Sequence, residues 1–213
     1  MFSQQDKLVL KRLAAQVHEI ALLPEQEKKR SMWRRHTALR HGIPPLFVSP
    51  EGSWTELIPE AALQCTDPFA REVELELRKR IYRQDDTPIE DHYDIPVSWI
   101  PVNEHWGLPV IRREAEGRGA WHYQPVVEDP SDWKKLKKPS LDVDVQGAEQ
   151  RAEQLRDAVG DSLQVHVTGI KIFDFHMAHI YCDFRGLENL FLDLADDEEM
   201  VRDVFAFLTD GLK

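Results

Sequence analysis

Residues 65–82 read CTDPFAREVELELRKRIY and give the clearest secondary-structure signal in the chain. Asp67 is a good helix N-cap, and Pro68 suits the first helical position because its missing N–H would have no partner there. Four apolar side chains then recur at helical spacing and form one stripe: Phe69, Val73, Leu77 and Ile81. The segment therefore predicts an amphipathic helix over residues 67–84 that buries one face.

Apolar periodicity predicts further elements on both sides of this helix. Helices are predicted at residues 6–20, 24–39, 148–159 and 196–208. Short strands are predicted at residues 45–48, 97–100, 121–123, 126–127 and 163–167. The helix, tight turn and strand within residues 148–167 form half of a βαβ unit, which favours an α/β architecture.

Composition sets the general class of the protein. The 213 residues are enough for one good core or two small ones, and 42% of them are hydrophobic. Neither a membrane-spanning run of ~20 apolar residues nor the basic start and apolar centre of a signal peptide is present in the sequence. The two cysteines, Cys65 and Cys182, have no spacing that suggests a bridge. A reducing, cytoplasmic setting without a membrane partner is therefore predicted.

The net charge of -11 is unevenly spread along the sequence. Residues 1–41 hold nine Lys/Arg against four Asp/Glu, and a basic cluster lies between Lys28 and Arg40. Such a cluster is compatible with a nucleic-acid surface or with a solvated helix face. The second interpretation is favoured, because an acidic protein repels phosphate. No nucleic-acid partner is predicted.

Four segments, taken in order, carry a resemblance to a known superfamily. They are residues 65–82, residues 103–108 (NEHWGL), residues 128–136 (EDPSDWKKL), and residues 185–190 (RGLENL) with the helix at 196–208. This order resembles the N-terminal part of uroporphyrinogen decarboxylase-like proteins. That superfamily also holds the methyltransferases that serve corrinoid proteins. The likeness runs from about residue 44 to residue 212.

The resemblance implies the N-terminal part of a (β/α)8 TIM-barrel-like fold. Residues 1–43 would form a helical N-terminal lead, and residues 44–213 a partial barrel-like domain. Complete barrels usually need ~250 residues, so a fragment or a shortened relative completed by a partner is expected. An incomplete barrel leaves open strand edges, and a homodimer would be one remedy.

The resemblance also implies a reaction class, namely methyl transfer between a small methylated substrate and a corrinoid protein. The zinc ligands of that branch lie in the C-terminal half of its members, so no metal ligand is assigned here; zinc and a corrinoid protein belong to a complete parent. The decarboxylase branch has an Arg-rich stretch where this chain reads SPEGSW at residues 49–54, which argues against porphyrinogen decarboxylation. The alternative is a non-catalytic binding or assembly module of the same fold.

His105 and Trp106 are candidate functional residues because they lie in a predicted loop. The His105 imidazole could move a proton near neutral pH, and the Trp106 ring could stack on a flat substrate. The alternative is a surface histidine beside a tryptophan that anchors the loop. A weaker hypothesis, an unrelated hydrolase or lyase, would use His105 together with Glu51.

Four candidates depend on the barrel interpretation. Thr168 and Gly169 follow the strand at 163–167, whose C-terminal end would face the active site and bind substrate; the alternative is an ordinary strand-to-loop turn. His176 would lie beyond them as a catalytic residue, and Glu51 occupies a similar place after the first predicted strand, as a base or a substrate anchor. A turn carboxylate in solvent is the favoured alternative for Glu51.

His176, His179 and Cys182 are spaced i, i+3 and i+6, and residues of these types bind zinc. One helix rarely presents three such residues to one ion, because the first and third are almost two turns apart. A packed helix with incidental histidines is therefore favoured over a metal site.

Overall fold

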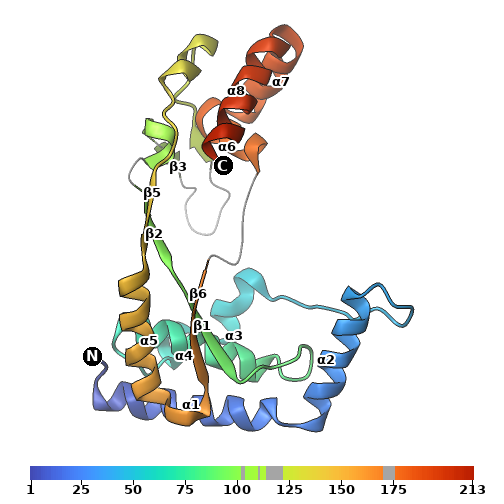
Figure 1. The fold of residues 1–213 in the computed structure, drawn as a ribbon, viewed down its shortest axis with the longest axis vertical. Coiled ribbons are helices and arrows are strands. Elements are labelled where there is room, and N and C mark those ends of the chain that lie inside the picture. Colours follow the sequence, from blue (N-terminus) through green and yellow to red (C-terminus); the bar gives the residue numbers. More distant parts are fainter. Residues whose placement is uncertain (102–103, 110, 114–121, 170–175) are drawn as a thin grey trace. The chain divides into compact units, whose positions relative to one another are not determined.

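The computed structural model describes residues 1–101, 104–109, 111–113, 122–169 and 176–213 (Figure 1). The chain divides into two compact units. Unit 1 comprises Met1–Val97 and Val145–Gly169, and unit 2 comprises Ser98–Asp144 and Ile170–Lys213. Each unit is thus assembled from two separate stretches of the chain. Within the described residues, no helix combines the length and the apolar character needed to cross a bilayer.

Unit 1 is a helical layer packed on a small parallel sheet (Figure 1). Its helices are α1 (Gln4–Ala21), α2 (Pro24–Thr37), α3 (Trp54–Leu57), α4 (Pro68–Tyr82) and α5 (Val145–Val159), with short 3-10 turns η1 (Glu51–Ser53), η2 (Glu60–Ala62) and η5 (Gly160–Ser162). Its strands are β1 (His92–Pro96) and β6 (Gln164–Thr168). The core is formed by apolar faces of α1, α4 and α5, with Leu10, Val17, Val73, Leu77 and Leu155 fully buried.

Local sequence signals explain where the main helices of unit 1 begin. Ser3 and Asp6 form a reciprocal capping box at the start of α1. Asp67 caps α4 as predicted, because its side chain accepts hydrogen bonds from the amides of Phe69 and Ala70. The predicted helices at 6–20, 67–84 and 148–159 are therefore confirmed, with small differences at their ends.

The sheet of unit 1 pairs two strands that lie about seventy residues apart. β1 and β6 run parallel, with Tyr93 opposite Val165 and Asp94 opposite His166. Tyr93, Ile95 and Val165 are buried and belong to the same core as the helices. Because successive side chains in a strand point to opposite faces, the residues between them occupy the other face of the sheet.

The described residues of unit 2 form two small antiparallel sheets and three helices. β2 (Ser98–Pro101) pairs with β5 (Leu141–Asp144), and β3 (Ile111–Arg113) pairs with β4 (His122–Gln124). The short turns η3 (Glu104–Gly107) and η4 (Pro130–Lys135) precede α6 (Met177–Arg185), α7 (Leu187–Asp196) and α8 (Glu198–Gly211). Its core contains Val127, Tyr181, Phe184, Val204 and Leu208.

The predicted fold class, the N-terminal part of a (β/α)8 TIM barrel, is wrong. The described residues are mainly helical, and their strands form three separate two-stranded sheets of which only β1–β6 is parallel. A TIM barrel instead requires one continuous parallel sheet. The chain leaves sheet β1–β6 at Val97 and enters sheet β2–β5 at Ser98, so the consecutive strands β1 and β2 belong to different sheets.

Two local predictions also differ from the structure. Residues 45–48 form no strand, since Leu46, Phe47 and Val48 are exposed and Pro45 has no N–H for a sheet ladder. The terminal helix is capped by Asp197, which accepts a hydrogen bond from the Met200 amide, and not by Asp196.

Candidate functional site

The face of sheet β1–β6 opposite the helical core carries a cluster of ionisable side chains. His92 and Asp94 lie on β1, and His166 lies on β6 directly opposite Asp94. The side chains of His92 and His166 are 39% and 51% exposed, whereas that of Asp94 is 15% exposed. The two imidazoles are therefore accessible to solvent, and the carboxylate between them is largely shielded. We call these three residues the His–Asp–His face.

The geometry places one carboxylate between two imidazoles. Nε2 of His92 lies 3.6 Å from Oδ2 of Asp94, and Nδ1 of His166 lies 3.4 Å from Oδ1. The two rings stack with centroids 5.7 Å apart. These nitrogen–oxygen distances exceed an ordinary hydrogen bond but lie within the range of an ion pair. A proton taken up by either imidazole therefore lies beside an opposite charge.

The strands that carry this face are held by arginines from the neighbouring helices. Arg80 on α4 donates to the His92 carbonyl at 2.5 Å, and Arg151 on α5 donates to the Pro96 carbonyl at 3.4 Å. Arg156, also on α5, donates to the Val165 carbonyl at 3.0 Å. Charged donors at outward-facing carbonyls protect the edges of a small sheet from unwanted strand pairing. The site is thus supported from the helical side.

Thr168 extends the site to the carboxyl end of β6. It shares a face with His166, since the two residues are separated by one strand position. Its Oγ1 is buried and has no hydrogen-bond partner among the described residues. A buried hydroxyl without a partner is unfavourable, so it marks a place where a ligand atom or a water would be stabilised.

The six residues singled out in the sequence are divided between the units. Thr168 and Gly169 lie together at the end of β6, and Glu51 begins the separate η1 turn of unit 1, where it is exposed with a φ of 44°. His176 is the exposed N-cap residue of α6 in unit 2. Within unit 1, Thr168 and Gly169 lie at the end of the strand that carries His166. The roles assigned to the six residues stay predictions.

Trp106 is a packing residue of unit 2. Its side chain is 8% exposed, its backbone has a φ of 60°, and its ring lies 6.0 Å from that of Phe207. His105 precedes it in η3, where the structure describes the backbone but not the imidazole. A Cβ added at Gly211 would lie 2.4 Å from the Trp106 ring, so the indole fills the space beside a glycine of α8.

The residues on α6 do not assemble a zinc site. His179 lies 3.7 Å from Asp183, and burial raises the pKa of the half-buried Cys182 thiol, with the Asp183 charge adding to the effect. Throughout the described part of the chain, no group of three His, Cys, Asp or Glu residues is placed to hold a metal ion. The residues present therefore do not fit the zinc that the resemblance associates with a complete parent.

Sequence reasoning missed His92, Asp94 and His166. A signal was present, because residues 92–96 and 164–168 both alternate polar and apolar side chains, as half-buried strands do. What brings the histidines to one carboxylate is the pairing of β1 with β6. That pairing is not encoded by any local motif.

Neither a family model, nor a curated protein, nor a solved structure matches this chain.

Proposed function

We propose that this chain belongs to an enzyme of the uroporphyrinogen decarboxylase-like type, related to the methyltransferases that serve corrinoid proteins. In this proposal the His–Asp–His face is its substrate-facing surface. The observation that carries it is the exposure of two histidines around one carboxylate on a parallel sheet. Parallel sheets are normally covered on both faces, yet here the helical core covers one face and the ionisable residues occupy the other.

The chemistry of methyl removal suggests a role for this face. When a methyl group leaves nitrogen, oxygen or sulfur, that atom must take up a proton. An imidazolium at His92 or His166 can donate this proton, and Asp94 stabilises the charged ring and fixes its orientation. The Thr168 hydroxyl can donate a hydrogen bond to the same substrate. In this proposal a small methylated molecule is the substrate and a corrinoid protein accepts the methyl group.

The test is histidine NMR of the whole chain during titration with three probes, namely trimethylamine, dimethyl sulfide and anisole. A substrate-facing site predicts that at least one probe shifts the imidazole signals of His92 and His166 and leaves those of His179 unchanged. Asp94→Asn should weaken that binding at least tenfold. If all three probes leave the His92 and His166 signals unmoved at millimolar concentration, the proposal is wrong.

Thr168→Val separates binding from folding at the same site. The hydroxyl makes no hydrogen bond within the described residues, so its loss should leave the free energy of unfolding within about 1 kcal/mol of the parent. A role in substrate binding predicts that this variant nevertheless loses affinity for the probe that shifts the histidines. A variant that binds that probe as well as the parent would remove Thr168 from the site.

A non-catalytic binding or assembly module is the second candidate function. It is favoured by the exposed apolar side chains of α7, where Leu187, Phe191, Leu192 and Leu194 are 47–64% exposed. Exposed apolar patches of this kind usually mark an interaction surface. Self-association of the chain together with unshifted His92 and His166 signals would favour this candidate over the enzyme.

We place the protein in a reducing, cytoplasmic compartment as part of the same proposal. Burial raises the pKa of the Cys65 thiol to about 12, with a further contribution from Glu74, so this cysteine is a poor nucleophile. Both cysteines are free thiols, which suits a compartment where disulfides do not form.

A further inference from the structure

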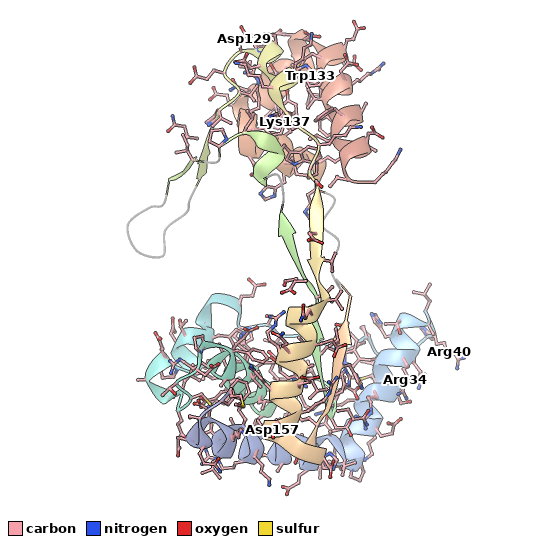
Figure 2. The ribbon with its side chains drawn as sticks, turned by 60° about the vertical axis from the view of Figure 1, so that its left-hand side comes forward. Arg34, Arg40, Asp129, Trp133, Lys137 and Asp157 are labelled. Carbon is pink, nitrogen blue, oxygen red and sulfur yellow. The ribbon has the colours of Figure 1, made fainter. Side chains whose placement is uncertain are left out.

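A groove of about 870 Å³ follows one side of α2 and the segment after it. Residues spaced three or four apart line it, including Lys28, Met32 and Arg35, and residues 40–44 close its far end. Figure 2 shows Arg34 on α2 and Arg40 just beyond the helix. The groove therefore combines an apolar methionine with long basic side chains, and all of its lining residues belong to unit 1.

Positive charge exceeds negative charge along this groove. Its lining includes Lys28, Arg35 and Arg40 against one carboxylate, Glu27. Glu27 is already engaged by Arg30 at 2.9 Å and by Arg34 at 3.2 Å, and Lys28 lies 3.9 Å from Glu25. Beside the groove, Leu39 and Ile43 are 94% and 91% exposed, which is unusual for large apolar residues. The surface thus suits a partner that is both acidic and apolar.

α7 has these complementary properties. It buries Leu190 and Asp193 but exposes Leu187, Phe191 and Leu194, which follow one helical stripe. Residues 186–200 contain six Asp/Glu and no Lys/Arg. Only Asp193 among the six is neutralised in the core, where it pairs with Arg185 at 2.7 Å. The remaining acidic residues flank an apolar helix face.

We propose that the α2 groove of one copy of this chain binds α7 of a second copy. An amphipathic helix lying in an apolar groove is a recurring mode of recognition. Each copy carries both surfaces, so two copies of the chain can associate through this contact. Nucleic acid is a poorer occupant, because a phosphate backbone would leave Met32, Leu39 and Ile43 uncovered and the whole chain carries a charge of -11.

Sedimentation equilibrium of the whole chain between 1 and 100 μM tests this dimer. The expected result is a concentration-dependent rise from 24.8 kDa to twice that mass, which is weaker at 500 mM than at 50 mM NaCl. Phe191→Ser should weaken dimerisation at least tenfold. Leu8→Ser is the matched control, because Leu8 is similarly exposed but lies on α1, and it should leave the dimer unchanged.

Charge reversal tests which surfaces meet. Arg35→Glu with Arg40→Glu should weaken the dimer at least tenfold, and so should Glu188→Lys with Asp196→Lys, two exposed carboxylates of α7. Combining both pairs should restore most of the affinity, a rescue that loss of folding cannot imitate. Circular dichroism of each variant checks its helix content. A chain that stays monomeric at every concentration, or a dimer indifferent to Phe191→Ser and to both reversals, would overturn the proposal.

Discussion

In unit 1, buried carboxylates bind the loop at residues 64–66. In unit 2, a buried guanidinium binds the loop at residues 127–128. In unit 1 the fully buried Glu74 accepts hydrogen bonds from the amides of Gln64 and Cys65 at 2.7–3.0 Å. Asp6 accepts one from the Thr66 amide at 2.7 Å. Two helices, α1 and α4, thereby bind the same stretch of chain before α4.

In unit 2 the buried side chain donates hydrogen bonds to the backbone, whereas in unit 1 the buried side chains accept them. Arg185 at the end of α6 donates hydrogen bonds to the carbonyls of Val127 and Glu128. Its charge is balanced by Asp193 on α7, which accepts two hydrogen bonds from it at 2.7 Å and one from the Tyr181 hydroxyl. The segment before η4 is therefore bound through carbonyl oxygens, and the carboxylate acts indirectly by fixing the arginine.

The comparison shows how a buried charge can order a segment that has no regular structure. Burial alone would raise the pKa of Glu74 and Asp6, but hydrogen bonds from backbone amides outweigh it and lower the pKa of both carboxyls. For Asp193 the hydrogen bonds from Arg185 are the main cause of a lowered pKa. In each unit the charged form is the one that stabilises the fold.

Lowering the pH should cause the largest loss in the free energy of unfolding, and it should destabilise both units. A carboxyl whose pKa is lowered in the folded state stabilises the protein above its unfolded pKa and loses that contribution as the pH falls through its folded pKa. The ordinary values are 3.8 for Asp and 4.5 for Glu, so stability should be constant above pH 5 and fall steeply below pH 4. Urea unfolding at pH 7, 5, 4 and 3 measures this, and equal stability at pH 7 and pH 3 would contradict it.

Arg185→Met should be the most damaging single change, and it should act on unit 2. It leaves Asp193 buried without its partner, which costs about 4 kcal/mol of the free energy of unfolding. Hydrogen exchange followed by mass spectrometry should show α6 and α7 losing protection while α1 and α4 keep theirs. Arg202→Met is the control, because that arginine forms an exposed ion pair with Glu198. Equal loss of protection in both units would contradict the division.

Glu74→Gln is the corresponding change in unit 1. The amide side chain keeps one acceptor oxygen but loses the charge that Cys65, Gln64 and Arg78 contact. We expect a loss of about 2 kcal/mol, smaller than for Arg185→Met because no opposite charge is left buried. Chemical denaturation measures the loss, and Glu72→Gln on the same helix is its control. A larger cost than that of Arg185→Met would reverse the comparison.

Of the four changes considered (acid, Arg185→Met, Glu74→Gln and Gly211→Ala), Gly211→Ala should destabilise the protein least. It should act through packing alone. The added Cβ would lie 2.4 Å from the Trp106 ring and 3.2 Å from Pro139, so the indole must shift. Overpacking of this kind costs about 1 to 2 kcal/mol. Gly52→Ala is the matched control, because nothing lies within 4 Å of its added Cβ. Thermal unfolding should give Gly211→Ala a lower melting temperature than Gly52→Ala. Equal melting temperatures would contradict the close approach of Gly211 to the Trp106 ring.

Most helices could be predicted because their signals are local. The capped start at Asp67 and the stripe from Val73 to Leu77 appear where the pattern places them, and the β-branched strand predicted at 163–167 is observed at 164–168. The predicted strand at 45–48 failed because an apolar run becomes a strand only with a partner, and its residues pair with no other segment in the described structure. The barrel failed for the same reason, since strand number and pairing are not local properties.

The sequence by itself determined the local elements of this protein: where the main helices of unit 1 begin, which face each buries, and that residues 163–167 are extended. It also determined the charge contrast between residues 24–44 and 186–200, since composition needs no fold. Only the tertiary structure decided that β1 pairs with β6, which brings His92, Asp94 and His166 together, and that Arg185 and Asp193 meet in a core. The physical reason is the sequence separation over which each interaction acts. Helix caps and apolar stripes involve residues a few positions apart, whereas the pairing of distant strands depends on the packing of the whole unit.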